Sequence, residues 1–462
     1  MSPVKTTITS ITRVLTSFLP RSIPTMARGH YSREAVAWAC LSLGVAAVEG
    51  GVTGVIAKYL FEGVVSPRML NLTVAILAGA PAFANIISFF WAGLSQGRDK
   101  IRFLVVMQSL AMLFIILIAF APRSPVGLML MTLGAVGARL CWSGVVTLRS
   151  TVWQANYPRE IRAKMAGKIT TIQTILITLT SLSIGLAIDL HDDAFRILYP
   201  FISFIGLIGA WVYKGMRVRR HKALLLAENA HGLDGRSRVN PLIFHRILIE
   251  DTNFRRYMTN MFIFGSGNLM IMAPMVIVLK EQFSLSPLTS VLITSTIPFM
   301  LMPFSIPIWS RLLDKVHIIE FRAYHGWSFV LANAFMLTAS VFHLTWLLWF
   351  SAILRGIAFG GGILGWNLGH HDFAPVEKAS QYMGVHVTLT GIRGMLVPII
   401  GVCIYEILEW THPGWGVWVF APCLILSIMG AIGFLRMRRT LSGPGHNSSF
   451  TDGPPIQPPA AV

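Results

Sequence analysis

Four ionisable side chains lie inside long apolar stretches of the sequence: Glu49, Arg139, Arg355 and Arg393. An arginine at the centre of a bilayer costs about 2.5 to 3.5 kcal/mol on insertion scales, so each arginine needs a partner or a wet cavity. A guanidinium binds carboxylates and phosphates with two parallel hydrogen bonds, and a carboxyl group shielded from water can take up a proton. Two interpretations follow. Glu49 ties two helices together by pairing with one arginine, or the four side chains form a positive site for an anion with Glu49 as its protonatable partner.

Other polar residues accompany these charges at helical spacing. His386, Thr390 and Arg393 are four and three residues apart, which places them on one face of a helix. Asn268 follows Gly267 in another apolar stretch, where a glycine lets a neighbouring backbone come close. We therefore predict a small-molecule site made of six residues, namely Glu49, Arg139, Asn268, Arg355, Thr390 and Arg393.

A second polar group, His370, His371 and Asp372, follows the stretch that contains Arg355, and His386 comes one connection later. Histidine and carboxylate side chains can bind a divalent metal ion. Adjacent residues of a helix point about 100° apart, however, so His370 and His371 cannot both face one ion without a helix break. We therefore favour a polar gate over a metal site, and we expect no resident metal or cofactor. No nucleophile stands at a spacing that would suit an enzyme.

The elements that hold these residues are predicted to be membrane-spanning helices. Of 462 residues, 54% are hydrophobic and only 13% are charged, which excludes a soluble enzyme. A helical span needs about 20 apolar residues. Twelve stretches qualify, at about 35–61, 69–95, 101–121, 126–148, 166–188, 196–216, 257–279, 287–309, 322–343, 345–369, 380–404 and 415–435. The sequence thus predicts an all-α polytopic membrane protein with twelve transmembrane helices.

The connections between these stretches predict five segments. They are a basic N-terminal segment at 1–33, a six-helix bundle at 34–216, a central loop at 217–255, a second six-helix bundle at 256–435 and a disordered tail at 436–462. The N-terminal segment carries apolar residues at helical spacing between its arginines. It is therefore either an amphipathic helix lying on an anionic membrane surface or a basic disordered tail.

The net charge of +18 is unevenly distributed along the chain. Of 38 Lys and Arg residues, three lie within apolar stretches and only five fall in the connections on one side, namely Lys58, Arg68, Arg123, Arg196 and Lys280. Cytoplasmic loops carry the excess of basic residues in membrane proteins. We therefore predict a multi-pass protein of the cell (cytoplasmic or inner) membrane with both termini and the central loop in the cytoplasm. Its charge indicates membrane topology and not nucleic-acid binding.

The two halves share residues at a nearly constant offset. Trp91 precedes Phe103 by 12 residues, and Trp309 precedes Phe321 by 12. Two further groups recur: Pro158, Glu160 and Gly167 as Pro375, Glu377 and Gly384, and Arg139 and Gly144 as Arg355 and Gly360. Duplicated six-helix units are a recurring transporter architecture, with the substrate between the halves near the bilayer midplane. The repeats predict two pseudo-symmetric bundles.

On these features the chain resembles the Major Facilitator Superfamily from about residue 34 to 435. The family's motif after the second span is Gly-x-Leu-Ala-Asp-Arg-x-Gly-Arg-Arg, and its second copy is similar to Ser310-Arg311-Leu312-Leu313-Asp314-Lys315. In the first copy, at 92–100, Gln96 replaces the acid. The family's fourth-span motif, an Arg followed by Gln-Gly, resembles the stretch from Arg139 to Gly144. The resemblance implies a gate at the motifs after the second and eighth spans, formed by Gln96, Arg98, Asp314 and Lys315. From their residue types and position we add His370, His371, Asp372 and His386 to this predicted gate.

The resemblance implies a secondary transporter that works by alternating access. We expect a monomer in the lipid bilayer that carries a small anionic solute, with a proton as the candidate co-substrate. Two alternatives remain open from the sequence. One is a transporter-like receptor or regulator that binds its ligand without moving it. The other is a divalent-metal transporter that uses His370, His371, Asp372 and His386.

Overall fold

The computed structural model describes residues 16–95, 97–157, 159–223, 225–226, 241–313, 315–370, 372–374 and 379–441. Within these ranges the regular structure is entirely helical. The predicted sites Gln96, Asp314 and His371 lie outside the described residues, as do 1–15, 227–240 and 442–462. We call the end of the molecule where α2 (Thr25–Ala47) begins and α19 (Phe420–Leu441) ends the terminus side, and the opposite end the distal side.

The first bundle contains six spans. The first is bent, with α2 followed by α3 (Gly50–Leu60), and the second contains α4 (Pro67–Phe83), η2 (Ala84–Ile87) and α5 (Ser88–Ser95). The remaining four are α6 (Lys100–Ala119), α7 (Pro125–Asn156), α8 (Arg159–Leu190) and α9 (Phe195–Lys214), with η3 (Asp192–Ala194) before the last. Ser or Asp side chains cap the first turns of α4, α6 and α7, which explains where these helices begin.

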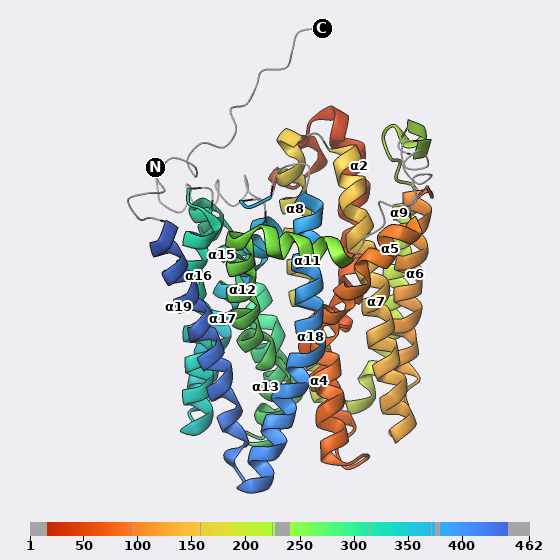
Figure 1. Ribbon diagram of the computed structural model, residues 1–462. Coiled ribbons are helices and arrows are strands. Elements are labelled where there is room, and N and C mark those ends of the chain that lie inside the picture. Colours follow the sequence, from red (N-terminus) through yellow and green to blue (C-terminus); the bar gives the residue numbers. More distant parts are fainter. Residues whose placement is uncertain are drawn as a thin grey trace, which may run out of the picture.

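The second bundle repeats this order. Its spans are α12 (Thr252–Met270) with α13 (Met272–Glu281), then α14 (Pro287–Val291) with η4 (Leu292–Thr296) and α15 (Ile297–Leu313), then α16 (Ile318–Val341), α17 (Thr345–Leu368) and α18 (Ala379–Thr411). The last span is η6 (Trp415–Val419) with α19. Between the bundles, α11 (Pro241–Glu250) packs on α12 and α18 and lies across the direction of the spans (Figure 1).

The described helices agree with the twelve predicted spans. Ten are long and apolar enough to cross a membrane, and the bent pair α2 and α3 forms another. The twelfth is α16, which carries Glu320, Arg322 and His325 but has 24 residues and packs beside α17 and α19. At about 1.5 Å per residue it is about 36 Å long, enough to cross the hydrocarbon core.

Several helices extend beyond their predicted ends. α2 begins at Thr25, so the last nine residues assigned to the N-terminal segment are helical. α7 continues to Asn156, eight residues past its apolar stretch. The prediction located the ends where hydropathy falls, but a helix can continue on the polar side of the membrane wherever its neighbours pack against it. Glu34 and Arg149 therefore lie inside helices.

The predicted repeat is visible as the same packing in both bundles. The Trp91 ring meets Phe103 at a centroid distance of 6.4 Å, and Trp309 meets Phe321 at 5.9 Å. Trp91 Nε1 donates to the Leu140 carbonyl at 3.0 Å, and Trp309 Nε1 donates to that of Ile357 at 2.8 Å. Leu140 and Ile357 are 217 residues apart. Arg139 and Arg355, which are 216 apart, are therefore not at equivalent positions, and their side chains leave the fourth and tenth spans about 100° apart.

The two bundles meet through α4 against α18 and through α8 against α14 and α15, and the first of these contacts lies at the centre of Figure 1. Close approach there depends on small residues. A Cβ on Gly79 would lie 2.5 Å from the Gly394 carbonyl oxygen, and one on Gly394 would lie 2.3 Å from Ala82 Cβ. Glycine and alanine at these positions bring the helix backbones together.

The apolar core is continuous on one side of the molecule and divided on the other. On the distal side a single cluster joins residues of both bundles, from Leu41 to Leu426. On the terminus side there are two separate clusters, one confined to the first bundle and one to the second. The apolar core therefore joins the two bundles on the distal side and is divided between them toward the terminus side.

Candidate functional site

The first span is broken where Glu49 stands. α2 and α3 meet at 41°, and Glu49 lies between them with extended backbone. Its Oε2 accepts from the amides of Gly51 at 2.8 Å and Val52 at 3.3 Å, which caps the first turn of α3. A carboxylate suits the positive end of a helix. A Cβ on Gly50 would lie 2.9 Å from the Ala78 carbonyl oxygen, so only glycine lets α3 pass this close to α4.

Arg139 provides hydrogen-bond donors to the backbone carbonyls on the other side of the same helix break. Its Nε donates to the Val48 carbonyl at 2.6 Å and its Nη2 to that of Val45 at 3.3 Å. These carbonyls end α2 and have lost their helical partners, so a cation here completes the hydrogen bonding of the negative helix end. Arg139 and Glu49 thus cap the two ends of one discontinuous helix. The structure accounts for Arg139 without any substrate.

Glu49 also reaches the second bundle. Ser295 Oγ donates to Glu49 Oε2 at 2.6 Å. Ser295 lies in η4, a one-turn π-helix, and such turns are frequently found at functional sites. The neighbouring residue Thr296 bonds Ser181 of α8 at 3.1 Å. A half-buried carboxylate therefore belongs to a hydrogen-bonded contact between the bundles, midway along the spans.

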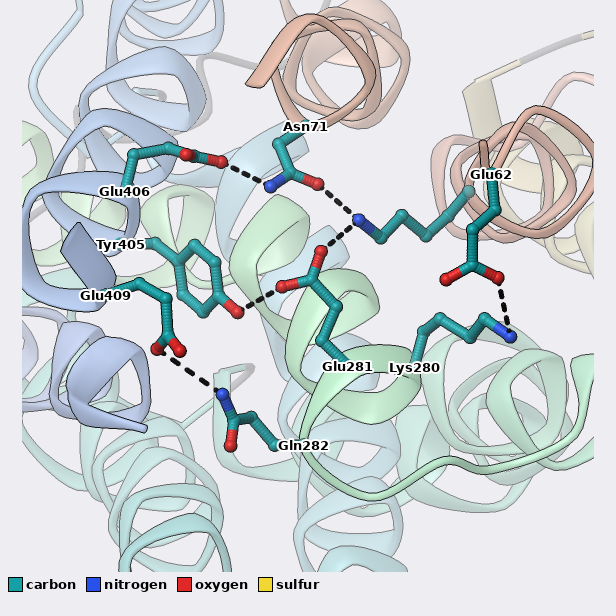
Figure 2. A network of polar contacts seen from close by, with 9 residues as sticks. Glu62, Asn71, Lys280, Glu281, Gln282, Tyr405, Glu406 and Glu409 are labelled. Atoms are coloured by element: carbon teal, nitrogen blue, oxygen red, sulfur yellow. Dashed lines mark hydrogen bonds and ion pairs between the residues drawn. The ribbon is translucent and has the colours of Figure 1, made fainter. Parts of the chain in front are cut away.

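A larger polar network joins the bundles on the distal side (Figure 2). Lys58, at the end of α3, pairs with Glu281 at the end of α13 and donates to Asn71 Oδ1 at 2.6 Å. Asn71 in turn donates to Glu406 of α18, and Tyr405 donates to Glu281. The side chain of Lys58 is only 3% exposed. The central ion pair is therefore largely shielded from water.

Outer contacts surround this pair. Lys280 pairs with Glu62 at 3.0 Å, and Tyr59 bonds Ser290 at 2.9 Å, each across the boundary between the bundles. Within the second bundle, Gln282 donates to Glu409 at 3.4 Å. The sequence analysis placed Lys58 and Lys280 in connections and missed this network. The missed signal was that Lys58 and Glu281 end the equivalent first and seventh spans.

Arg393 lies in a group of buried basic residues in the second bundle. Its Nη1 donates to the Met261 carbonyl at 2.5 Å, and its guanidinium lies against Gly265, so it points at α12. Arg322 of α16 lies against Gly365 and faces His325 Nδ1 at 3.4 Å. The charged neighbours of His386 are Arg393, Arg322 and His370. We call Arg322, Arg393 and His386 the basic cluster.

The basic cluster has positive charge and unused donors. Exposed fractions are 2% for Arg322, 7% for Arg393 and 2% for His386. The Nε atoms of both arginines and Nε2 of His386 are buried and have no hydrogen-bond partner among the described residues. The described residues also provide no ion pair for either guanidinium. Sequence reasoning missed Arg322 because it stands at the edge of its apolar stretch.

The other predicted site residues have different neighbours. Asn268 accepts from Asn333 of α16 at 3.1 Å and from Ser427 of α19 at 3.4 Å, which ties three helices of one bundle. Arg355 is 1% exposed, and no hydrogen bond of its Nε or Nη2 is found within the described part of the chain. Thr390 Oγ1 bonds its own helix at the His386 carbonyl. The six residues therefore do not form one compact site.

A buried carboxylate in the first bundle also escaped prediction. Glu34 is fully buried and accepts from Tyr157 at 2.6 Å and from Trp153. Arg149 lies between two indole rings, 4.1 Å from the Trp38 centroid and 4.4 Å from that of Trp153. Half-buried Arg149 and buried Arg139 thus each have a carboxylate nearby, Glu34 for Arg149 and Glu49 for Arg139.

The predicted gate residues on the terminus side are only partly described. Arg98 and Lys315 are exposed in equivalent turns. Asp372 accepts from the Ile318 amide at 2.7 Å and lies 4.0 Å from His317 Nε2, so it caps α16. His370 is buried. Within the described ranges no group of three or more His, Cys, Asp and Glu side chains could hold a metal ion.

The same substitution at Arg139 and at Arg355 should affect stability differently. Arg139→Met leaves two helix-end carbonyls without their donor, so we expect it to lower the free energy of unfolding by about 2 kcal/mol. Arg355→Met removes a buried charge without an ion pair and should leave stability unchanged or increase it. Thermal unfolding of the purified variants measures both. Equal losses would show that Arg355 is also a structural tie.

Three solved structures share this fold at low sequence identity. A peptide transporter POT in complex with sulfate has a TM-score of 0.63 and 13% identity, covering 89% of this chain and 96% of its own. A D-xylose-proton symporter gives 0.62 and 13%, covering 88% and 96%. The nucleoside transporter NupG gives 0.60 and 15%, covering 87% and 99%. At these identities the likeness concerns the fold alone.

Comparison of the sequence with protein-family models identifies the family. No curated protein matches the chain. The family model of the Major Facilitator Superfamily, in contrast, matches residues 38–398, from the first span to the eleventh. This match, the duplicated six-helix units and the broken first span agree with one another. The chain therefore belongs to the Major Facilitator Superfamily.

Proposed function

We propose that this secondary transporter moves a small anionic solute, which binds at the basic cluster of the second bundle. The observation that carries the proposal is an imbalance of buried charge. In the first bundle Glu49 lies near buried Arg139 and Glu34 near half-buried Arg149. In the second bundle Arg355 and Arg393 are buried with no carboxylate nearby among the described residues, and buried Arg322 has no ion pair there. A buried charge without a counter-charge is costly, and a bound carboxylate or phosphate would supply one to the cluster.

The unused nitrogens support an anion at this position. Nε of Arg393, Nε of Arg322 and Nε2 of His386 come from three residues on two helices. A planar guanidinium can offer Nε and one terminal nitrogen to the two oxygens of a carboxylate. The terminal nitrogen Nη1 of Arg393 is held by the Met261 carbonyl, which fixes the orientation of the group. Holding the guanidinium in one orientation lowers the ordering cost of binding an anion there.

The conformation fits entry from the terminus side. The distal network and the continuous distal core hold the bundles together there, while the terminus-side cores are separate. The basic cluster lies among residues of the second bundle's terminus-side core. With both termini in the cytoplasm of a cell with an inner membrane, as the distribution of basic residues predicts, this would be an inward-facing state.

A ligand screen on the purified protein tests the proposed cargo. We expect mono- and dicarboxylates or phosphate esters to raise the unfolding temperature, and sugars, nucleosides and organic cations to have no effect. Compounds that bind are then offered to proteoliposomes, where accumulation distinguishes a transporter from a receptor. If only neutral or cationic solutes bind or accumulate, the anion site is refuted.

Glu49→Gln should separate binding from proton coupling. The amide oxygen can still accept from the Gly51 amide, so α3 keeps its cap, but the side chain can no longer gain or lose a proton. We expect unchanged ligand affinity and an uptake rate that no longer depends on pH. Glu34→Gln is the matched control, because Glu34 is buried and the hydrogen bonds that the structure describes for it stay within the first bundle. Retained pH dependence in Glu49→Gln, or its loss only in Glu34→Gln, would contradict this assignment.

A further inference from the structure

Two basic crevices lie at equivalent places on the terminus side. The first has a volume of about 400 Å³ between the start of α12 and the end of α19, the seventh and twelfth spans. The second, of about 470 Å³, lies between the start of α2 and the residues after α9, the first and sixth spans. Duplication of the six-helix unit places both at the same junction of their bundles. Both lie outside the basic cluster.

The lining of the first crevice is cationic. Arg255, Arg256 and Arg436 are all exposed and line it, together with Thr259 and Thr440. No acidic residue lines it. Two nearby acids have other partners. Asp251 caps α12 at the Phe254 amide and accepts from Tyr382, and Glu320 pairs with Arg438 at 2.9 Å. The second crevice repeats this chemistry, with Arg33, Arg217 and His30 beside Thr25 and Ser32.

The depth of the first crevice matches the phosphate layer of a membrane. Trp418 is 44% exposed near the distal end of the last span, where interfacial tryptophans are expected. From Trp418 to Arg436 is 18 residues, or about 27 Å along the span, close to the thickness of a hydrocarbon core. Arg436 therefore lies at headgroup level on the terminus side.

Exposed apolar side chains of α19 lie between the first crevice and the bilayer centre. Ile425 and Met429 are 55% and 52% exposed. They precede Arg436 by 11 and 7 residues, which places them on the same face of α19. This face of α19 thus has the Arg436 guanidinium at its terminus-side end, beside the arginines of α12, and exposed apolar side chains toward the bilayer centre. That order corresponds to an anionic headgroup followed by an acyl chain.

We propose that the two crevices bind the headgroups of anionic phospholipids, one lipid in each. A phosphodiester bound at the first crevice would bridge α12 and α19, and one at the second would bridge α2 and the segment after α9. The lipids would thus join the first and last spans of each bundle. This inference is independent of the cargo, because no crevice residue belongs to the basic cluster.

Native mass spectrometry of the full-length protein tests the proposal, with phosphatidylglycerol and phosphatidylcholine as probes. We expect wild type to retain two phosphatidylglycerol molecules more tightly than phosphatidylcholine. The triple variant Arg255→Gln, Arg256→Gln and Arg436→Gln should bind one of them about tenfold more weakly or worse. Retention of the other lipid shows that the variant is folded. The matched control Arg246→Gln, Arg311→Gln and Arg439→Gln removes the same charge from exposed positions outside both crevices and should retain both lipids.

Three outcomes would overturn the proposal. The first is retention of both lipids by the crevice variant. The second is equal loss in the control variant, which would indicate diffuse attraction to the surface charge. The third distinguishes the source of the phosphate: if inorganic phosphate at millimolar concentration displaces phosphatidylglycerol and stabilises the protein as well as the lipid does, the crevices bind free phosphate and not lipid.

Discussion

Lys58→Met should open the distal side of the transporter. The ammonium of Lys58 is the only cation in the inner part of the distal network that the structure describes, where it holds Glu281 of the other bundle and the Asn71 oxygen. Without it, Tyr405 is the donor left to Glu281 and Asn71 the donor left to Glu406 among the described residues. The closed state then contains two carboxylates without a counter-charge, whereas in the open state water can solvate both.

The size of this effect follows from the burial of the pair. Removing one partner of a fully buried ion pair costs about 3 to 5 kcal/mol, and an exposed pair contributes about 0 to 1 kcal/mol. The side chain of Lys58 is 3% exposed and that of Glu281 26%, so this pair lies between the two limits. We expect about 2 kcal/mol, which corresponds to roughly a 30-fold shift of the equilibrium toward the state that is open on the distal side.

Spin labels at Arg68 and Thr411 measure that equilibrium, because both side chains are exposed at the distal ends of α4 and α18. Lys58→Met should convert most of the distance distribution to the longer separation. Lys280→Met is the matched control. It removes the same charge from the outer pair with Glu62, whose carboxylate side chain is 56% exposed, and should change the populations by less than about fivefold. An unchanged distribution in Lys58→Met, or an equal change in both variants, would show that Lys58 does not hold the distal side closed.

The overall architecture was predictable because it depends on patterns that extend over the whole chain. Apolar stretches of span length predict the helices, and the Trp91 and Trp309 repeats predict the duplication. The same patterns carry less information about side-chain direction. A difference of one residue between the offsets 216 and 217 separates Arg355 from the position equivalent to Arg139. Moving by one residue along a helix rotates the side-chain direction by about 100°. Arg139 therefore points at the helix break, whereas Arg355 points into the interior of its bundle.

The polar sites were less predictable, because their partners are distant in the sequence. Lys58 and Glu281 are 223 residues apart, and Glu49 and Ser295 are 246 apart. No local spacing relates such residues. Glu34 and Arg322 were missed for a different reason: each lies at the edge of an apolar stretch, where hydropathy suggests solvent, while packing by neighbouring helices buries both. Hydropathy reports the environment of a segment, whereas burial of one side chain depends on the facing helices.

Substitution of Arg393 should have the largest effect on substrate binding. In Arg393→Gln the cluster loses a charge and its strongest donor, and we expect anion binding to fall below detection. Arg393→Lys retains the charge but has one nitrogen, which can satisfy the Met261 carbonyl or the ligand but not both with guanidinium geometry. A hydrogen bond to a charged group contributes about 1.5 to 3 kcal/mol, so the lysine variant should bind roughly 10 to 150 times more weakly.

Isothermal titration with an anion found in the screen measures these affinities, and two further variants make the result specific. Arg355→Lys is the matched control, because Arg355 is equally buried in the same bundle but is not a charged neighbour of His386. Its affinity should equal that of wild type. Arg322→Lys should weaken binding as Arg393→Lys does, and the double variant should lose less than the sum of the two, because both guanidiniums contact one ligand. Wild-type affinity in Arg393→Lys, or an equal loss in Arg355→Lys, would mean that the buried arginines serve the packing of the second bundle and that the solute binds elsewhere.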